Sequence, residues 1–97
     1  MERVTLVEVM SKRSRILELA HGRKAKRVRI FGSLARGTSS PESDVDFLVD
    51  FEPDASALDQ VGLVHDLEGL LGVGVEVVSA GGLQPRHEGI VRQAIEL

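Results

Sequence analysis

Apolar residues recur along the chain with two different spacings, and each spacing predicts one kind of secondary structure. Alternating apolar and polar residues over 27–31, 44–51 and 73–78 predict three strands, because successive side chains of a strand point to opposite faces. Apolar residues three or four apart predict helices over 11–21, 56–72 and 85–97. The opening stretch, 2–10, fits a strand or a helix.

Capping residues mark where the predicted helices begin and end. Ser11 and Ser56 are expected N-caps, and Gly22 and Gly72 are expected to stop the first two of these helices. The second helix is expected to bury a stripe formed by Leu58, Val61, Val64, Leu67 and Leu71. The resulting order of elements predicts an α/β (α+β) fold, a small mixed β-sheet flanked by helices, in a single domain over residues 1–97.

Composition narrows the class of protein. The 97 residues include no cysteine, so disulfides and thiolate metal sites are excluded. No apolar run approaches the roughly 18 residues that span a membrane, and no signal-peptide pattern is present, so we expect a cytoplasmic protein without membrane contact. An overall acidic chain with only three aromatic residues argues against a nucleic-acid ligand.

The net charge of −3 hides a strong asymmetry. Residues 1–40 sum to +7 and residues 41–97 to −10. The boundary falls in a polar, turn-rich stretch that separates a group of candidate anion-binding residues from a pair of acidic residues.

The acidic pair is Asp44 and Asp46. Two residues apart on a strand, their side chains share one face, with Cα atoms roughly 6.5–7 Å apart. Such carboxylates repel unless a cation lies between them, and Mg²⁺ prefers one or two carboxylates together with phosphate oxygens. An isolated pair of this kind is more often simply the water-facing side of a strand.

The candidate anion site comes just before this pair. A strand that ends in Gly32-Ser33, at a predicted helix start, offers backbone N–H groups and a hydroxyl to an anion, and Arg36 adds a charged fork for phosphate oxygens. Taken alone, Gly32-Ser33 could be a tight turn and Arg36 a surface charge. The combination of a phosphate-binding segment and a metal-binding pair favours the functional interpretation.

The pattern Gly32-Ser33-x-Ala35-Arg36-Gly37-x5-Ser43-Asp44-x-Asp46 resembles the signature of the nucleotidyltransferase superfamily that includes DNA polymerase beta. The short chain further resembles minimal nucleotidyltransferases, or MNT domains. This resemblance implies that Gly32, Ser33, Arg36 and Ser43 hold the phosphates of a nucleotide. It also implies that Asp44 and Asp46 bind one or two Mg²⁺ ions.

The superfamily usually adds a third carboxylate, mostly aspartate, from a later strand. The matching residue is Glu76, which the alternation Val75-Glu76-Val77 places on the polar side of its strand. By resemblance Glu76 is a third metal ligand and catalytic residue that deprotonates the acceptor hydroxyl. Because glutamate is one methylene longer than aspartate, Glu76 departs from the usual residue of the superfamily at this position.

Two functions follow from the resemblance. The first is a Mg-dependent transfer of AMP from ATP to a hydroxyl of a partner protein, with a tyrosine of a cognate HEPN-type toxin as the expected acceptor, so that the chain acts as an antitoxin. The alternative is a catalytically weak or inactive antitoxin that neutralises its toxin by direct binding.

Overall fold

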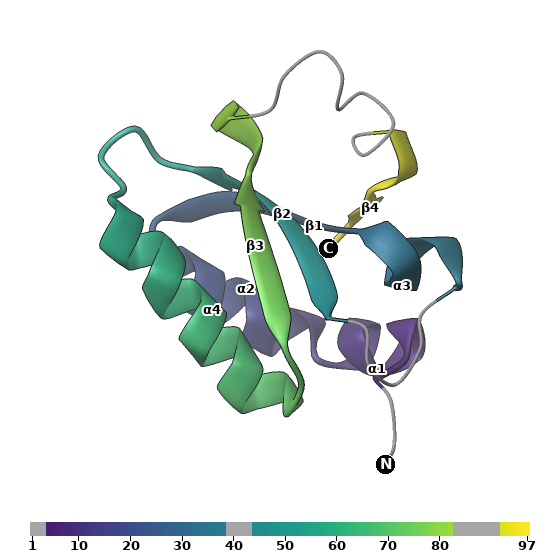
Figure 1. Cartoon of the computed structure of the whole chain (residues 1–97). Helices are drawn as coiled ribbons and strands as arrows, with labels where there is room; N and C mark the ends of the chain where they lie inside the picture. The colour runs from purple at the N-terminus through teal and green to yellow at the C-terminus, as the bar shows by residue number, and fades with distance from the viewer. Residues whose placement is uncertain (1–3, 39–43, 83–91) are drawn as a thin grey trace.

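The chain folds into a mixed sheet with helices on one of its faces, as a computed structural model shows for residues 4–38, 44–82 and 92–97 (Figure 1). Its elements are α1 (Leu6–Ser11), α2 (Arg13–His21), β1 (Ala25–Phe31), α3 (Gly32–Arg36), β2 (Val45–Phe51), α4 (Ala57–Leu71), β3 (Val75–Ser79), a 3₁₀ turn η1 (Ala80–Gly82) and β4 (Ile95–Glu96).

The strands lie in the order β3-β2-β1-β4. β2 pairs antiparallel with β1 and parallel with β3, and β4 pairs antiparallel with β1. Helices α2 and α4 contact each other, with α2 packed on β1 and α4 on β3 (Figure 1). The predicted fold class, a small mixed sheet flanked by helices, is confirmed.

Strand alternation gives the sheet two chemically different faces. The strand residues that face the helices are apolar and buried: Val28, Ile30, Val45, Phe47, Val49, Val75 and Val77. They form one core with Ile16 and Ala20 of α2 and with Leu63 and Leu67 of α4. The intervening residues of the same strands, including Asp46, Asp50 and Glu76, therefore lie on the second face. The acidic side chains of β2 and β3 are therefore on this second face.

At the N-terminal end, the structure resolves the open choice between strand and helix and corrects the predicted N-cap of α2. The opening stretch forms a helix, and Thr5 caps it by accepting a hydrogen bond from the Glu8 N–H (3.2 Å). Ser11 is the last residue of α1 rather than the N-cap of α2, a position that Lys12 occupies. By contrast, Ser56 does cap α4, where its N–H donates to the Asp59 carboxylate (2.9 Å).

The predicted apolar stripe of α4 was partly wrong. Leu58 is 80% exposed and Val61 53% exposed, whereas Leu63 is fully buried together with Leu67. Leu63, Leu67 and Leu71 are spaced by four residues and face the sheet. α4 is apolar on more than one side, so periodicity could not tell which stripe the sheet covers.

The predicted C-terminal helix was wrong at its end. Ile95 and Glu96 form β4 opposite Ile30 and Arg29, and the Leu97 N–H donates to the Val28 carbonyl (3.0 Å). Pairing satisfies the outer backbone groups of β1, which a helix would leave unpaired. The start of that predicted helix, at Pro85, lies outside the described residues.

Side chains of α4 close the opposite edge of the sheet. Gln60 Nε2 donates to the Val77 carbonyl (2.8 Å), and the Glu68 carboxylate accepts from the Val75 N–H (3.2 Å). These contacts occupy backbone groups of β3 that a further strand would otherwise use.

Among the described helices, none is long and apolar enough to cross a membrane.

The corrected stripe of α4 gives a matched pair of leucine variants. Leu63→Ala removes a fully buried side chain and is expected to lower the free energy of unfolding by about 3 kcal/mol. Leu58→Ala, on the exposed side of the same helix, is expected to change it by less than about 0.5 kcal/mol. Chemical denaturation of both variants measures the difference, and equal losses would contradict this assignment of the buried face.

Candidate active site

Gly32 and Asp46 are in direct contact. β1 ends at Phe31, and the chain turns into α3 at Gly32 with a φ of +77°, a conformation that favours glycine. Phe31 is the register partner of Asp46 on β2. A Cβ atom added to Gly32 would overlap the Asp46 carboxylate and lie only 3.0 Å from its Cγ. The absence of a side chain at Gly32 therefore makes room for this carboxylate.

Glu76 faces Asp46 across the sheet. The two residues are register partners in the parallel pairing of β2 and β3. Neighbouring strands lie about 4.8 Å apart, so side chains on the same face reach each other. Asp46 is half-buried and Glu76 is exposed, and Glu76 is close enough to contribute to the raised pKa of Asp46. The structure thus brings together two residues that lie 30 positions apart in the sequence.

Asp44 lies one residue before β2, not within the strand as its alternation suggested. Its carboxylate approaches the α-carbon of Gly74, where an added Cβ would overlap it, and the Val45 N–H donates to the Gly74 carbonyl (2.9 Å). Sequence reasoning missed Gly74. A glycine at the second position of the third predicted strand, 73–78, was the available signal of a close approach.

Ser33 and Arg36 lie on α3, at the end of the sheet where Asp46 lies. Buried Leu34 holds this short helix to the core, and Gly37 ends it with a φ of +76°. Arg36 is exposed, and its positive charge opposes the rise in the pKa of Asp46. Ser43, predicted to contact phosphates, lies outside the described residues.

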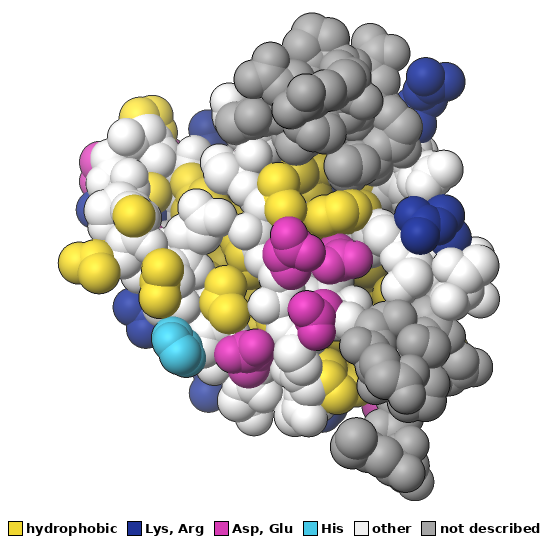
Figure 2. Space-filling model, in the orientation of Figure 1, with side chains coloured by type: hydrophobic (Ala, Val, Ile, Leu, Met, Phe, Trp, Pro, Cys, Tyr) yellow, Lys and Arg dark blue, Asp and Glu magenta, His cyan; other side chains and the backbone are white. Residues whose placement is uncertain are grey.

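Negative charge accumulates at the carboxylates. Burial, the hydrogen bond to Glu76 and the charges of Glu76 and Asp44 raise the pKa of Asp46 to about 6. Figure 2 shows acidic side chains gathered at the centre of one face, with basic side chains toward the edges of the view. A cation placed here would relieve this repulsion.

The carboxylates of this site fit a Mg²⁺ ion that is shared with a nucleotide better than they fit a metal ion held by protein ligands alone. Within the described ranges, no three His, Asp or Glu side chains are grouped closely enough to hold a metal ion. Mg²⁺ commonly takes one or two carboxylates and completes its octahedron with phosphate oxygens and water. Asp44 and Asp46 are suited to that role, beside the predicted phosphate-binding residues on α3.

Comparison with known proteins identifies the class of this chain. The family model described as "Nucleotidyltransferase domain" matches residues 10–96. The chain therefore belongs to the nucleotidyltransferase domain family, and its fold and motif are those of a minimal nucleotidyltransferase domain.

Individual relatives support this assignment. A candidate protein adenylyltransferase of Methanocaldococcus jannaschii, MJ0435, is 39% identical over 80 residues, which cover 81% of this chain and 84% of the relative. A solved structure described as a candidate minimal nucleotidyltransferase is 44% identical and superposes with a TM-score of 0.88 over the full length of both chains.

Two more distant solved structures share the fold. One is a toxin–antitoxin complex with AMP-PNP, with 22% identity and a TM-score of 0.72, and the match covers 86% of this chain and 69% of the other. The second is a tri-AMPylated Shewanella oneidensis HEPN toxin in complex with its MNT antitoxin, with 18% identity and a TM-score of 0.67 over 90% and 69% of the respective chains.

The contact between Gly32 and Asp46 is testable with two glycine variants. Gly32→Ala and Gly72→Ala each place a side chain at a positive φ and are expected to cost about 1–2 kcal/mol of stability. Only Gly32→Ala also displaces the Asp46 carboxylate, because the space beside Gly72 is open. Nucleotidyl transfer is therefore expected to fall about 100-fold in Gly32→Ala alone. Equal activity of the two variants would contradict the inferred contact.

The raised pKa of Asp46 predicts a pH-dependent effect on metal-free stability. Its folded-state pKa of about 6 exceeds the ordinary value of 3.8, so ionisation of Asp46 destabilises the fold above pH 6 and not below about pH 4. Asp46→Asn removes this penalty. After allowance for solvent screening of a half-buried group, we expect the variant to be about 1 kcal/mol more stable than the parent at pH 8.

Urea denaturation in the presence of EDTA measures this difference. The gain in stability of Asp46→Asn is expected to be largely lost as the pH is lowered to 4, where the carboxyl group of folded-state Asp46 is protonated and as neutral as asparagine. A gain that is the same at pH 8 and pH 4 would show that repulsion at Asp46 is not its cause.

Proposed function

We propose that this nucleotidyltransferase is a protein adenylyltransferase, which transfers AMP from ATP to a hydroxyl of a partner protein in a Mg-dependent reaction. A tyrosine of a HEPN-type toxin is the proposed acceptor, so that the chain acts as an antitoxin. The observation that carries the proposal is the position of the Asp46 carboxylate, which lies against Gly32 and opposite Glu76. The adenylyltransferase name of the relative and the content of the two toxin–antitoxin structures support the substrate and the partner.

Each site residue has a role that its position allows. Asp44 and Asp46 would hold Mg²⁺, while Gly32, Ser33, Arg36 and Ser43 would hold the phosphates. When bound, Mg²⁺ supplies positive charge that neutralises the triphosphate and the charge that develops during transfer. Arg36 would add a further positive charge at the same end of the sheet.

The proposed reaction exchanges one phosphorus–oxygen bond for another. The acceptor oxygen forms a bond to the α-phosphorus of ATP, and the bond from that phosphorus to the oxygen bridging the β-phosphate breaks. Pyrophosphate leaves with the electron pair, and the acceptor proton passes to a carboxylate. Glu76 is the proposed base because it is exposed toward solvent while it remains opposite Asp46.

The composition of the chain bears on the acceptor. The 97 residues contain no tyrosine, so a tyrosine acceptor would lie outside them. This is consistent with modification of a separate protein, and it allows transfer to be measured without self-labelling at tyrosine.

Incubation with a HEPN-type toxin, Mg²⁺ and ATP labelled in the α-phosphate tests the proposal. Labelled AMP is expected on the toxin, and Asp46→Asn is expected to reduce it at least 100-fold because a metal ligand is lost. Glu76→Gln is expected to reduce the rate by about 100-fold, the range of a lost general base, with ATP binding retained.

The matched control is Asp54→Asn, which neutralises an exposed carboxylate paired with Lys24 at 2.8 Å, away from the site. This variant should transfer AMP at the parent rate. Neutralisation of the toxin without any label, unchanged in Asp46→Asn, would contradict the proposal and favour an antitoxin that acts by binding alone.

A further inference from the structure

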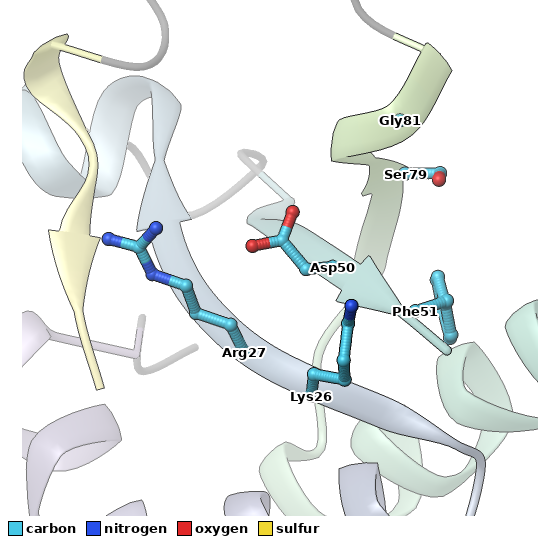
Figure 3. Close-up of a pocket in the computed structure, with 6 residues that line it drawn as sticks. All are labelled: Lys26, Arg27, Asp50, Phe51, Ser79 and Gly81. Atoms are coloured by element: carbon cyan, nitrogen blue, oxygen red, sulfur yellow. The ribbon is translucent and has the colours of Figure 1, made fainter. Parts of the chain in front are cut away.

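A second polar site lies on the sheet, at the opposite end of β2 from Asp46. It is a pocket of about 430 Å³ lined by Lys26 and Arg27 of β1, Asp50 and Phe51 of β2, Ser79 of β3 and Gly81 of η1 (Figure 3). Asp46 and Asp50 share one face of β2, and buried Leu48 separates them. The pocket is therefore distinct from the carboxylate site, although both lie on the second face of the sheet.

An irregularity in β1 supplies the positive charge of this pocket. The register with β2 shifts between Ala25, which pairs with Phe51, and Arg27, which pairs with Asp50, so Lys26 is an extra residue. Ala25 is buried, while Lys26 and Arg27 are both exposed. Such a bulge interrupts the alternation of side chains and redirects them, and bulges are common beside functional sites. In Figure 3 Lys26 extends between Asp50 and Phe51.

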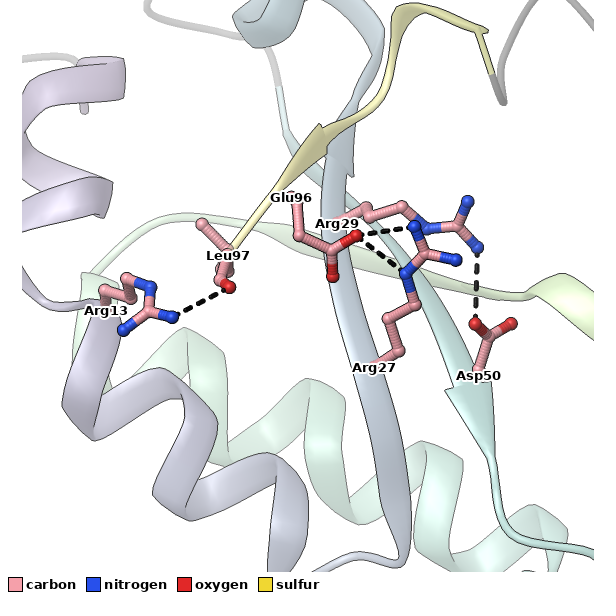
Figure 4. A network of polar contacts seen from close by, with 6 residues as sticks. All are labelled: Arg13, Arg27, Arg29, Asp50, Glu96 and Leu97. Atoms are coloured by element: carbon pink, nitrogen blue, oxygen red, sulfur yellow. Dashed lines mark hydrogen bonds and ion pairs between the residues drawn. The ribbon is translucent and has the colours of Figure 1, made fainter.

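Most charges around the pocket already have partners. Arg27 pairs with Glu96, with contacts of 2.7 Å through Nε and 2.6 Å through a terminal nitrogen, and Arg29 contacts Asp50 at 3.4 Å (Figure 4). Among the described residues, the Lys26 side chain has no hydrogen bond or ion pair. The two pairs cancel, so Lys26 is the one unpaired charge among the described residues that line the pocket.

One unpaired cation among the described lining residues matches a ligand with one negative charge. Asp50 would repel a phosphate dianion, but it can accept a hydrogen bond from a peptide N–H while Lys26 binds a carboxylate. The Ser79 hydroxyl and the Phe51 ring add a polar and an apolar contact. These properties fit a glutamate or aspartate side chain together with its own backbone.

We propose that this pocket binds an acidic side chain of the acceptor protein and thereby positions the segment that carries the modified hydroxyl. The inference rests on the proposed function. Asp46 and Asp50 are four residues apart on β2, which corresponds to about 13 Å. An extended acceptor segment spans the same distance with four residues, so the acidic side chain lies about four residues from the modified hydroxyl.

Peptide binding in the absence of nucleotide tests the pocket directly. The first probe is an unstructured peptide with one tyrosine and a glutamate four residues away on each side, and the second replaces both glutamates with glutamine. Titration of each peptide into isotope-labelled protein, followed by NMR, gives the dissociation constants and the residues affected. The glutamate peptide is expected to bind about threefold to fivefold more tightly, with shifts at the pocket residues.

Lysine variants supply the matched control. Lys26→Gln is expected to remove the preference for glutamate, whereas Lys12→Gln, at an exposed lysine outside the pocket, should retain it. Equal binding of the two peptides, a preference that survives Lys26→Gln, or displacement of the peptide by an equimolar amount of inorganic phosphate would overturn the proposal.

AMP transfer to the same peptides, measured separately, distinguishes the two proposals. Transfer to tyrosine without any glutamate preference would overturn only the pocket assignment. Conversely, Lys26-dependent binding without transfer to any acceptor would contradict the proposed function, and with it the role of this pocket in positioning an acceptor.

Discussion

Asp46 lies on an inner strand of the sheet with its carboxylate against the α-carbon of Gly32 and opposite Glu76. The contact requires that β1 and β2 pair in one register and that the chain leave β1 through a glycine at positive φ. It also requires β3 to pair parallel with β2. A shift of one residue in either pairing would turn Asp46 away from these partners, because successive side chains point to opposite faces.

The same strands supply both the stability and the chemistry of the molecule. Val45, Phe47 and Val49 of β2 are buried against the helices, while Asp46 and Asp50 alternate with them along the strand and lie on the other face. Burial of the apolar face fixes the strands, so the carboxylates are held by the packing of their neighbours. The raised pKa of Asp46 reflects the cost of ionising a carboxyl group in that position without a cation.

Charge is distributed along the second face in two distinct ways. The Asp46 end carries neighbouring carboxylates, which suit a cation and a nucleotide. The Asp50 end carries paired charges and the ammonium of Lys26, which is unpaired within the part of the chain that the structure describes. The proposed transfer of AMP to a protein would require both a site for the nucleotide and a surface for the acceptor. Two sites about 13 Å apart on one strand satisfy that requirement within a small domain.

The sequence by itself determined the fold class, the boundaries of most strands to within two residues, and the motif of Gly32, Ser33, Arg36, Asp44 and Asp46. These features depend on local alternation, capping residues and spacing, which are present in the chain before it folds. Membership in the nucleotidyltransferase family agrees with that motif.

Only the tertiary structure decided which stripe of α4 is buried and that Ile95 and Glu96 pair with β1. The structure also decided that a bulge in β1 directs the Lys26 side chain toward a pocket. It also placed Glu76 beside Asp46 and Gly74 beside Asp44. Each of these outcomes depends on the register between segments far apart in the sequence. Register is set by packing and backbone pairing across the sheet, and local periodicity contains no information about it.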